Sequence, residues 1–166
     1  IEAAGGTVNA TTSSDRTNYF ETVPRGALDL ALWLEADRLE SLTITEENFE
    51  AQRQVVKEEK RERYDNQPYG DLLELLVGQH FPDTHPYGHL TIGSMEHLDA
   101  AELPDVADFW RAWYRPSNAH LVLAGPISPD EGFTLAERHF GRLPKREPLS
   151  PRAASTKPRK ISSLSE

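Results

Sequence analysis

The chain has 166 residues, of which 37% are hydrophobic and 27% charged, a balance typical of one soluble globular domain with a hydrophobic core. The formal net charge is −9, and residues 1–144 carry 12 Lys/Arg against 25 Asp/Glu, which argues against nucleic-acid binding. The absence of cysteine excludes disulfides and thiolate metal sites, and no apolar run is long enough to span a membrane.

A β-hairpin is predicted by the segment TVNATTSSDRTNYFETV. It is rich in Thr, Val, Tyr and Phe, which favour strands, and its central SSDR has turn character. We therefore expect antiparallel strands at about residues 7–13 and 16–23. In the next stretch, 27–39, nine of thirteen residues are apolar, which predicts a helix that is buried on most sides.

A long charged helix is predicted next. Thr43, with Glu46 three residues later, predicts a capping box at its start, and the helix should end before Pro68. Residues three and four positions apart share a helix face. One such face carries Phe49, Gln52, Val56, Glu59 and Arg63.

This face raises the question of what Glu59 contacts. Phe49 and Val56 mark the face as inward, so Glu59 is predicted to point into the fold. A buried carboxylate needs a partner, which could be a cation, a hydrogen-bond donor or a metal. The competing interpretation places Glu59 in the solvated run of seven charged residues, Lys57–Arg63, where basic neighbours satisfy it. Glu58 is expected at the surface or in a salt bridge.

The second half of the chain is predicted to be mainly helical. Ser94 caps a short turn, and Ser128 followed by Pro129 is typical of a helix start. The apolar run AHLVLAG is typical of a strand. In chain order, we expect a Leu-rich helix at 69–80, a loop at 81–93, a helix at 104–114, a strand at 119–125 and a helix at 129–140.

These elements together indicate an α+β domain in which helices pack on a mostly antiparallel sheet. Three predicted strands are few for a sheet that must cover so many apolar helix faces, so we expect the domain to be incomplete. It comprises residues 1–144. Residues 145–166 are basic and rich in Pro and Ser, which is typical of a linker or of the approach to a further strand.

Three groups of residues occur in an order and spacing that resemble a known family. They are Gly5-Gly6-x-x-Asn9-Ala10-x-Thr12 followed by Thr17-x-Tyr19, then Arg53-x-Val55-Val56-x-Glu58-Glu59, then His85-Pro86-Tyr87 with Gly93 and Tyr114-x-Pro116-x-Asn118-Ala119. Over about residues 2–145, this pattern resembles the pitrilysin/insulinase family of zinc peptidases, which includes the mitochondrial processing peptidases.

The resemblance implies a zinc-dependent endopeptidase that hydrolyses extended or unfolded peptides with zinc-bound water as the nucleophile. In this family a helical H-x-x-E-H motif supplies two His ligands and the general base, and a glutamate on a later helix completes the protein ligands. The pattern places that glutamate at Glu59. The partner implied for its inward carboxylate is therefore Zn²⁺.

The sequence departs from the family pattern in two ways. H-x-x-E-H does not occur in it, so we expect this motif upstream of Ile1. The 166 residues alone are then expected to lack peptidase activity and to bind zinc weakly. The position seven residues before the ligand holds Gln52, where the family has a glutamate. An amide still orients a ligand or water by hydrogen bonding but adds no charge.

The resemblance also assigns substrate contacts. Asn9 and Ala10 fall on the edge strand to which family members add the peptide substrate as a further strand. The pocket for the side chain that precedes the cleaved bond corresponds to Thr11, Phe20, Tyr69 and Leu72. Because family members pair such domains around a chamber, the expected partner is a second homologous domain or subunit.

Two other functions stay open from the sequence. A non-catalytic scaffold or partner subunit of the same family is favoured by Gln52 and by the absent histidine motif, whereas Glu59 favours the enzyme. An unrelated peptide-binding module would use its strand edge alone. His85 and His89 have the spacing of a helical metal site, but the Pro and Gly between them exclude a helix, so ordinary loop histidines are expected.

Overall fold

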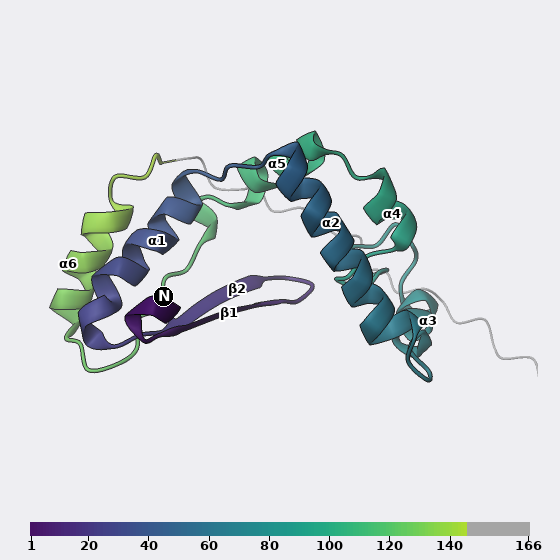
Figure 1. Cartoon of the computed structure of the whole chain (residues 1–166), viewed down its shortest axis with the longest axis horizontal. Helices are drawn as coiled ribbons and strands as arrows, with labels where there is room; N and C mark the ends of the chain where they lie inside the picture. The colour runs from purple at the N-terminus through teal and green to yellow at the C-terminus, as the bar shows by residue number, and fades with distance from the viewer. Residues whose placement is uncertain (146–166) are drawn as a thin grey trace, which may run out of the picture. The chain divides into compact units, whose positions relative to one another are not determined.

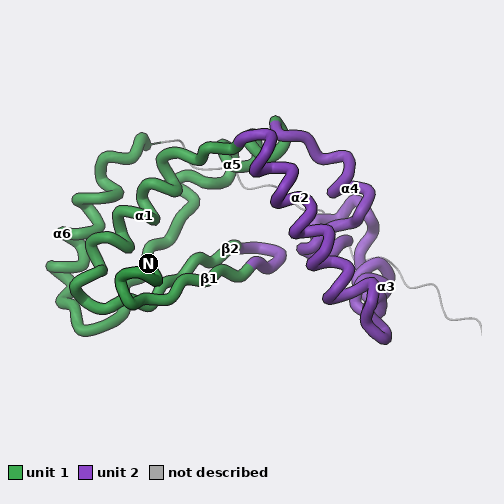
Figure 2. Tube along the Cα trace, viewed as in Figure 1, with its two compact units in different colours: residues 1–11, 17–44, 104–150 green, residues 12–16, 45–103, 151–166 purple. Residues whose placement is uncertain are grey.

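The computed structural model describes residues 1–145, which form two compact units (Figure 2). Unit 1 comprises Ile1–Thr11, Thr17–Ile44 and the described chain from Pro104 onward, and unit 2 comprises Thr12–Arg16 and Thr45–Leu103. The main elements of this part of the chain are labelled in Figure 1 and are, in chain order, β1 (Thr7–Thr12), β2 (Thr17–Thr22), α1 (Leu28–Glu40), α2 (Glu46–Lys60), α3 (Leu72–His80), α4 (Met95–Ala100), α5 (Leu103–Trp113) and α6 (Pro129–Phe140). None of these described helices has the length and apolar character that crossing a membrane requires. The predicted linker or further strand from residue 145 lies, apart from Lys145, outside the described residues.

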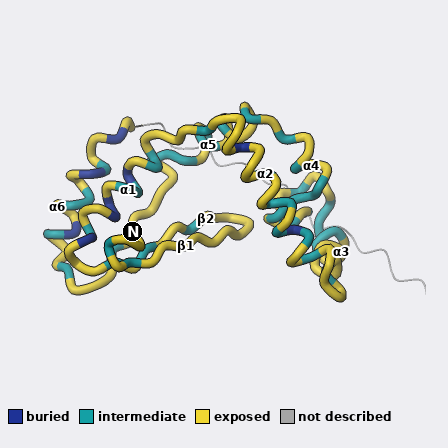
Figure 3. The backbone as a smooth tube through the Cα atoms, viewed as in Figure 1, coloured by how far each residue is buried: buried dark blue, intermediate teal, exposed yellow. Residues whose placement is uncertain are grey.

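The predicted hairpin is present as a two-stranded antiparallel sheet of β1 and β2. Its turn is closed by a 2.8 Å hydrogen bond from the Ser13 N–H to the Arg16 carbonyl. At the other end a glycine is required at Gly6, because a Cβ there would lie 2.8 Å from the Thr22 carbonyl oxygen. Every residue of β1 is exposed (Figure 3), so this strand contributes no buried side chain to a core.

The prediction of a mostly antiparallel sheet is wrong. Residues 1–145 form a helix-rich α+β fold with this one small sheet. The expected strand at 119–125 accounts for part of the error, because residues 119–124 have no regular structure and Val122 is 82% exposed. An apolar run becomes a strand only where another strand accepts and donates backbone hydrogen bonds, and in the described chain β1 and β2 pair only with each other.

The core of unit 1 lies along one face of α1, which contacts α6. Ala31, Leu32 and Ala36 are buried there. The prediction that this helix is buried on most sides is wrong, since Leu30 and Trp33 are 42% and 46% exposed. Within unit 1, α6 contacts one face of α1, so Leu30 and Trp33, which lie outside that face, stay partly in solvent.

Ion pairs join the same two helices. His139 is 10% exposed and its Nε2 lies 2.9 Å from Asp29 Oδ1, while Arg138 Nη1 lies 3.0 Å from the same oxygen. The hydrogen bond from His139 lowers the pKa of Asp29 below its usual value. Arg142 pairs with Glu40 at 2.9 Å. The sequence pattern assigned His139 no role. In the structure it is a buried contact between α1 and α6.

The helix starts are set by side-chain caps. Ser94 and Ser128 accept hydrogen bonds from the N–H groups three residues later, as predicted. The capping box of α2 is formed by Thr45 and Asn48, not by Thr43 and the following glutamate. The two candidate caps, Thr43 and Thr45, are two residues apart. The path of the preceding chain decides which of them adopts the extended backbone that a cap requires.

A pair of carboxyl groups links β2 to α1. Burial and a hydrogen bond with Glu21 together raise the pKa of Glu35 to about 7, although the guanidinium of Arg38, 2.8 Å from Glu35 Oε1, opposes the shift. Arg38 also lies over the Tyr19 ring at 4.3 Å. The Tyr19 hydroxyl is 2.6 Å from that of Tyr114, and burial raises the pKa of Tyr19 to about 12.

In unit 2, Arg53 joins α2 to the end of α4. Its guanidinium donates hydrogen bonds to the carbonyl oxygens of Leu98, Asp99 and Ala101, which the last turn of α4 leaves without helical partners. The same group packs on the Phe49 ring at 4.6 Å. Since the Arg53 side chain is only 13% exposed, these contacts are shielded from water.

We predict that Glu35→Gln removes part of the pH dependence of stability. Because folding raises this pKa from 4.5 to about 7, the stabilisation is complete below pH 4.5 and is lost as the pH rises through 7. The amide imitates the protonated acid, so the variant should gain stability relative to wild type between about pH 5 and 8. Urea unfolding at these two pH values measures it. Asp37→Asn, at an exposed position of the same helix, serves as the control, and a parallel response of wild type and Glu35→Gln to pH would refute the prediction.

We also predict that Arg53→Met lowers the free energy of unfolding by about 2–3 kcal/mol, because three carbonyls lose a charged donor in a sheltered site. Arg61→Met is the matched control. Its guanidinium pairs with Glu58 and is 43% exposed, so the expected loss is about 0.5 kcal/mol or less. Urea denaturation followed by circular dichroism compares the two, and equal effects would contradict the role given to Arg53.

Candidate functional site

Glu59 lies at the end of α2, where the α-helix gives way to a π-helical turn at Arg61–Asp65. Its carboxylate oxygen Oε1 is 2.9 Å from Nη1 of Arg63, and its side chain is 38% exposed. Arg63 is 72% exposed, so this ion pair is screened by water and contributes little stability. The partner of Glu59 in the structure is thus the exposed Arg63, which another cation could replace.

The buried face of α2 differs in part from the predicted one. Phe49 is buried and Val56 half-buried as expected, but Gln52 and Arg63 are exposed. Lys60 is buried instead. The inward position of Lys60 explains the difference. Because the buried face of α2 includes Lys60, Gln52 lies outside this face and Glu59 lies at its margin.

Lys60 has charged partners on two sides. Its Nζ lies 3.5 Å from Asp65 Oδ1 and 3.6 Å from Glu74 Oε2, and it faces the Tyr64 ring at 5.7 Å. These contacts tie the end of α2 to the π-helical turn and to α3. They compensate the cost of removing an ammonium group from water. Sequence reasoning missed Lys60 because it stands in a run of charged residues that looks uniformly solvated.

The described residues provide few side chains that could bind a metal ion together. No three His, Cys, Asp or Glu side chains within residues 1–145 are grouped so that they could hold one. The Glu59 carboxylate is a suitable oxygen donor for zinc and is partly open to solvent. Glu58 is exposed and pairs with Arg61 at 2.9 Å, as predicted. This part of the chain therefore fits zinc as the source of one ligand.

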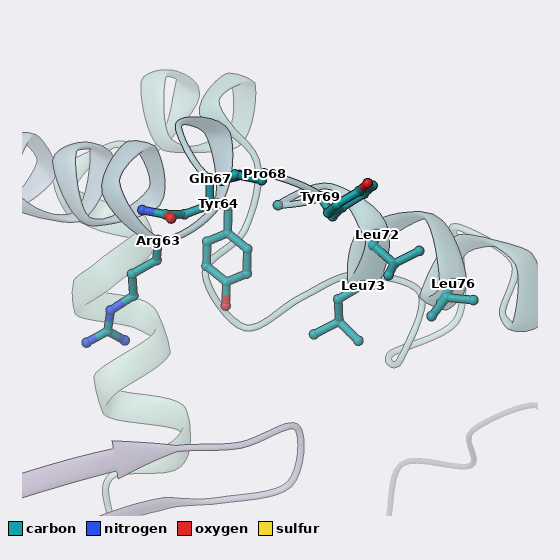
Figure 4. Close-up of a pocket in the computed structure, with 9 residues that line it drawn as sticks. Arg63, Tyr64, Gln67, Pro68, Tyr69, Leu72, Leu73 and Leu76 are labelled. Carbon is teal, nitrogen blue, oxygen red and sulfur yellow. The ribbon is translucent and has the colours of Figure 1, made fainter.

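A shallow depression of about 380 Å³ lies between the π-helical turn and α3 in unit 2 (Figure 4). Tyr69 and Leu72, both expected at a substrate pocket, line it. Sequence reasoning did not include the other apolar members, although their spacing on a helix next to Leu72 was a usable signal. The further lining includes Arg63, Tyr64, Leu73 and Leu76.

Tyr69 has an unusual backbone. Its φ of 60° is in the left-handed region, which disfavours residues other than Gly, and its side chain is 85% exposed. The neighbouring Gly70 is required, since a Cβ there would clash with the Tyr64 carbonyl oxygen. This turn delays the start of α3 to Leu72, three residues later than predicted. A strained residue that exposes a large aromatic ring is a common feature of binding sites.

The remaining predicted substrate residues lie on the hairpin. Asn9, Ala10 and Thr11 are exposed in β1, and the Asn9 side-chain oxygen accepts a 2.8 Å hydrogen bond from the Ala10 N–H. The turn pairing of Ser13 with Arg16 sets a register in which Asn9 lies opposite Phe20, which is 44% exposed. Thr11 and Phe20 are not among the residues that line the depression.

The chain resembles known proteins in both sequence and structure. One family model, described as Insulinase (Peptidase family M16), matches residues 1–91, and another, described as Peptidase M16 inactive domain, matches residues 100–165. The zinc protease PqqE of Helicobacter pylori is 36% identical over 143 residues, which cover 86% of this chain and 32% of that protein. The probable mitochondrial-processing peptidase subunit beta of Schizosaccharomyces pombe is 30% identical over 155 residues, 90% of this chain and 33% of that protein.

The structure matches as well. The crystal structure of a protease from Helicobacter pylori superposes with a TM-score of 0.80 at 35% sequence identity, covering 93% of this chain and 36% of that one. The chain thus spans about a third of the length of the relatives that it matches. Because the insulinase model alone accounts for residues 1–91 of 166, and the fold agrees, the chain belongs to the insulinase (M16) peptidase family, as the residue pattern predicted.

Proposed function

We propose that this chain is part of a zinc-dependent endopeptidase, to which it contributes one metal ligand, Glu59, and a surface that binds an extended peptide. The observation that carries the proposal is the partly exposed Glu59 carboxylate at the end of α2, the residue to which the sequence pattern assigns the role of the family's glutamate ligand. The names of the relatives, which include several zinc proteases, support the same chemistry.

The surroundings of Glu59 suit a ligand. Its ion pair with the exposed Arg63 is weak, so the carboxylate can exchange this partner for a metal at little cost. The π-helical turn that follows is a feature frequently found at functional sites. When bound, zinc supplies a Lewis acid that polarises a peptide carbonyl and activates water. Gln52, exposed two turns earlier, is placed to hydrogen-bond a ligand or water without adding charge.

The hairpin supplies a substrate edge. β1 pairs with β2 on one side, and along its other side no strand of the described chain pairs with it. An extended peptide added there would gain backbone hydrogen bonds that do not depend on its sequence. Asn9 adds a side-chain amide to this edge. This arrangement favours extended or unfolded segments over folded proteins as substrates.

The depression beside Tyr69 supplies a pocket for an apolar side chain. Tyr69, Leu72 and the neighbouring Leu73 and Leu76 are mostly apolar, and each is about half exposed or more. Arg63 at the rim is the charged group of the lining. A substrate side chain that fills this space would bury surfaces which otherwise face water.

The 166 residues by themselves are proposed to lack peptidase activity. H-x-x-E-H is absent from their sequence, and a single carboxylate does not make a catalytic zinc site. The other ligands and the general base would come from elsewhere in the intact enzyme. A second homologous domain or subunit is the proposed partner, which is supported by a relative whose name includes subunit beta.

A second candidate function is a non-catalytic scaffold or partner subunit of the same family. It is favoured by Gln52 in place of the family glutamate, and by the match of residues 100–165 to a model described as an inactive domain. The metal ligand distinguishes the two functions, because a scaffold has no need of Glu59.

We predict that Glu59→Gln in the intact enzyme lowers zinc affinity by more than the roughly 10–100-fold that loss of an outer hydrogen-bond partner costs. Zinc content after dialysis against graded chelator measures the affinity, and hydrolysis of an unfolded protein is followed in parallel. In the 166-residue chain the same change should leave the unfolding free energy within about 0.5 kcal/mol, since the Arg63 ion pair is exposed. Glu58→Gln is the matched control, and equal zinc retention by both variants would rule out Glu59 as a ligand.

We predict that Tyr69→Asn separates binding from stability. Asn tolerates left-handed backbone better than Tyr, so the unfolding free energy should stay unchanged or rise by up to about 1 kcal/mol. Loss of the exposed ring should weaken binding of a peptide with a large apolar side chain several-fold. Tyr69→Phe keeps the ring and should bind like wild type. Calorimetric titration measures the binding of the peptide, and urea unfolding measures the stability. A Tyr69→Asn variant that is destabilised but binds normally would contradict both expectations.

A further inference from the structure

The His85-Pro86-Tyr87 motif acquires a contact in the structure that links it to the hairpin turn. The Tyr87 hydroxyl donates to Asp15, with its oxygen 2.7 Å from Oδ1 and 2.9 Å from Oδ2. Asp15 belongs to the turn between β1 and β2, and both residues are in unit 2. The hydrogen bond to Asp15 raises the pKa of Tyr87, so its hydroxyl remains a donor at neutral pH.

Tyr87 is held by its own loop. The Phe81 and His85 rings stack at 4.8 Å, and the Tyr87 ring meets Phe81 edge-on at 5.7 Å. The Tyr87 N–H donates to Nδ1 of His85 at 3.0 Å. The loop is therefore a compact aromatic cluster that presents the Tyr87 hydroxyl in a defined direction.

β2 contacts α1 through Tyr19 and Glu21, but neither of these contacts reaches the turn of the hairpin. The hairpin consists of two strands, and every residue of β1 is exposed. A two-stranded ribbon without a core face is marginally stable in water. Within the turn, the Ser13 N–H to Arg16 carbonyl bond closes the loop, but it does not attach the turn to any other element. The hydrogen bond from Tyr87 does so.

We propose that Tyr87 is a positioning residue for peptide binding, which acts through Asp15 by anchoring the hairpin turn and keeping the outer edge of β1 extended. The inference rests on the proposed function, in which a peptide adds to that edge. An anchored turn lowers the cost of ordering the strand when the peptide binds. The motif thus has a role away from the metal, and it contributes to the affinity for the peptide backbone.

The anchor is tested by hydrogen exchange in the full 166-residue chain, without peptide. Tyr87→Phe and Asp15→Ala should each speed exchange of the amides in 7–12 and 17–22 by about fivefold, the effect of one net hydrogen bond on local opening. The double variant should exchange no faster than either single one, because both remove the same contact. Asp83→Ala, in the same loop, is the control and should match wild type. Unchanged exchange in Tyr87→Phe, or additive effects in the double variant, would overturn the anchor.

The positioning role is tested by binding a fluorescein-labelled decapeptide of alternating threonine and valine. Tyr87→Phe should raise its dissociation constant by a factor similar to that seen in exchange, and Asp83→Ala should not. Faster exchange with an unchanged dissociation constant would overturn the positioning role while leaving the edge itself intact. Absence of binding to the wild-type chain would instead overturn the substrate edge, and with it this inference. The two failures are therefore distinguishable.

Discussion

Basic side chains buried beneath α2 fix the orientation of that helix about its own axis. Arg53 donates to carbonyls at the end of α4, and Lys60 lies within 3.6 Å of Asp65 and Glu74. Rotation of α2 would leave these cations without partners, which is costly away from water. Because successive residues of an α-helix are about 100° apart, two inward cations also determine where every other residue of α2 points. Glu59 is placed at the margin of the buried face as a consequence.

This margin position suits the proposed role of Glu59 as a metal ligand. A fully buried carboxylate would be committed to partners inside the fold, and a fully exposed one would be too mobile to serve as a ligand. Glu59 is 38% exposed and is held only by an ion pair with an exposed arginine. The irregular features of the unit follow it directly in the chain, namely the π-helical turn and the strained Tyr69. Local strain at this place is consistent with a surface shaped for binding rather than for stability.

The hairpin presents a comparable balance. β1 is exposed along its whole length, yet the proposed function requires an edge that is already extended when a peptide arrives. In the structure, both ends of the hairpin are held in place. Gly6 allows close approach of the two strands at one end, and Asp15 is anchored at the other. The anchored turn and the close approach at Gly6 thus bear on the proposed peptide edge from opposite ends of the hairpin.

Sequence by itself determined the hairpin, the positions of the helices and the family. These follow from local signals, such as strand-forming residues around a turn or the caps at Ser94 and Ser128, and from a residue pattern that runs along most of the chain. Glu59, Gln52 and the substrate residues could be named from the same pattern, because it runs through the positions that they occupy. The tertiary structure alone decided that residues 119–124 form no strand, that Lys60 rather than Gln52 faces inward, and that Tyr87 reaches Asp15. Each of these depends on a partner distant in the sequence, and local propensity carries no information about whether that partner is present.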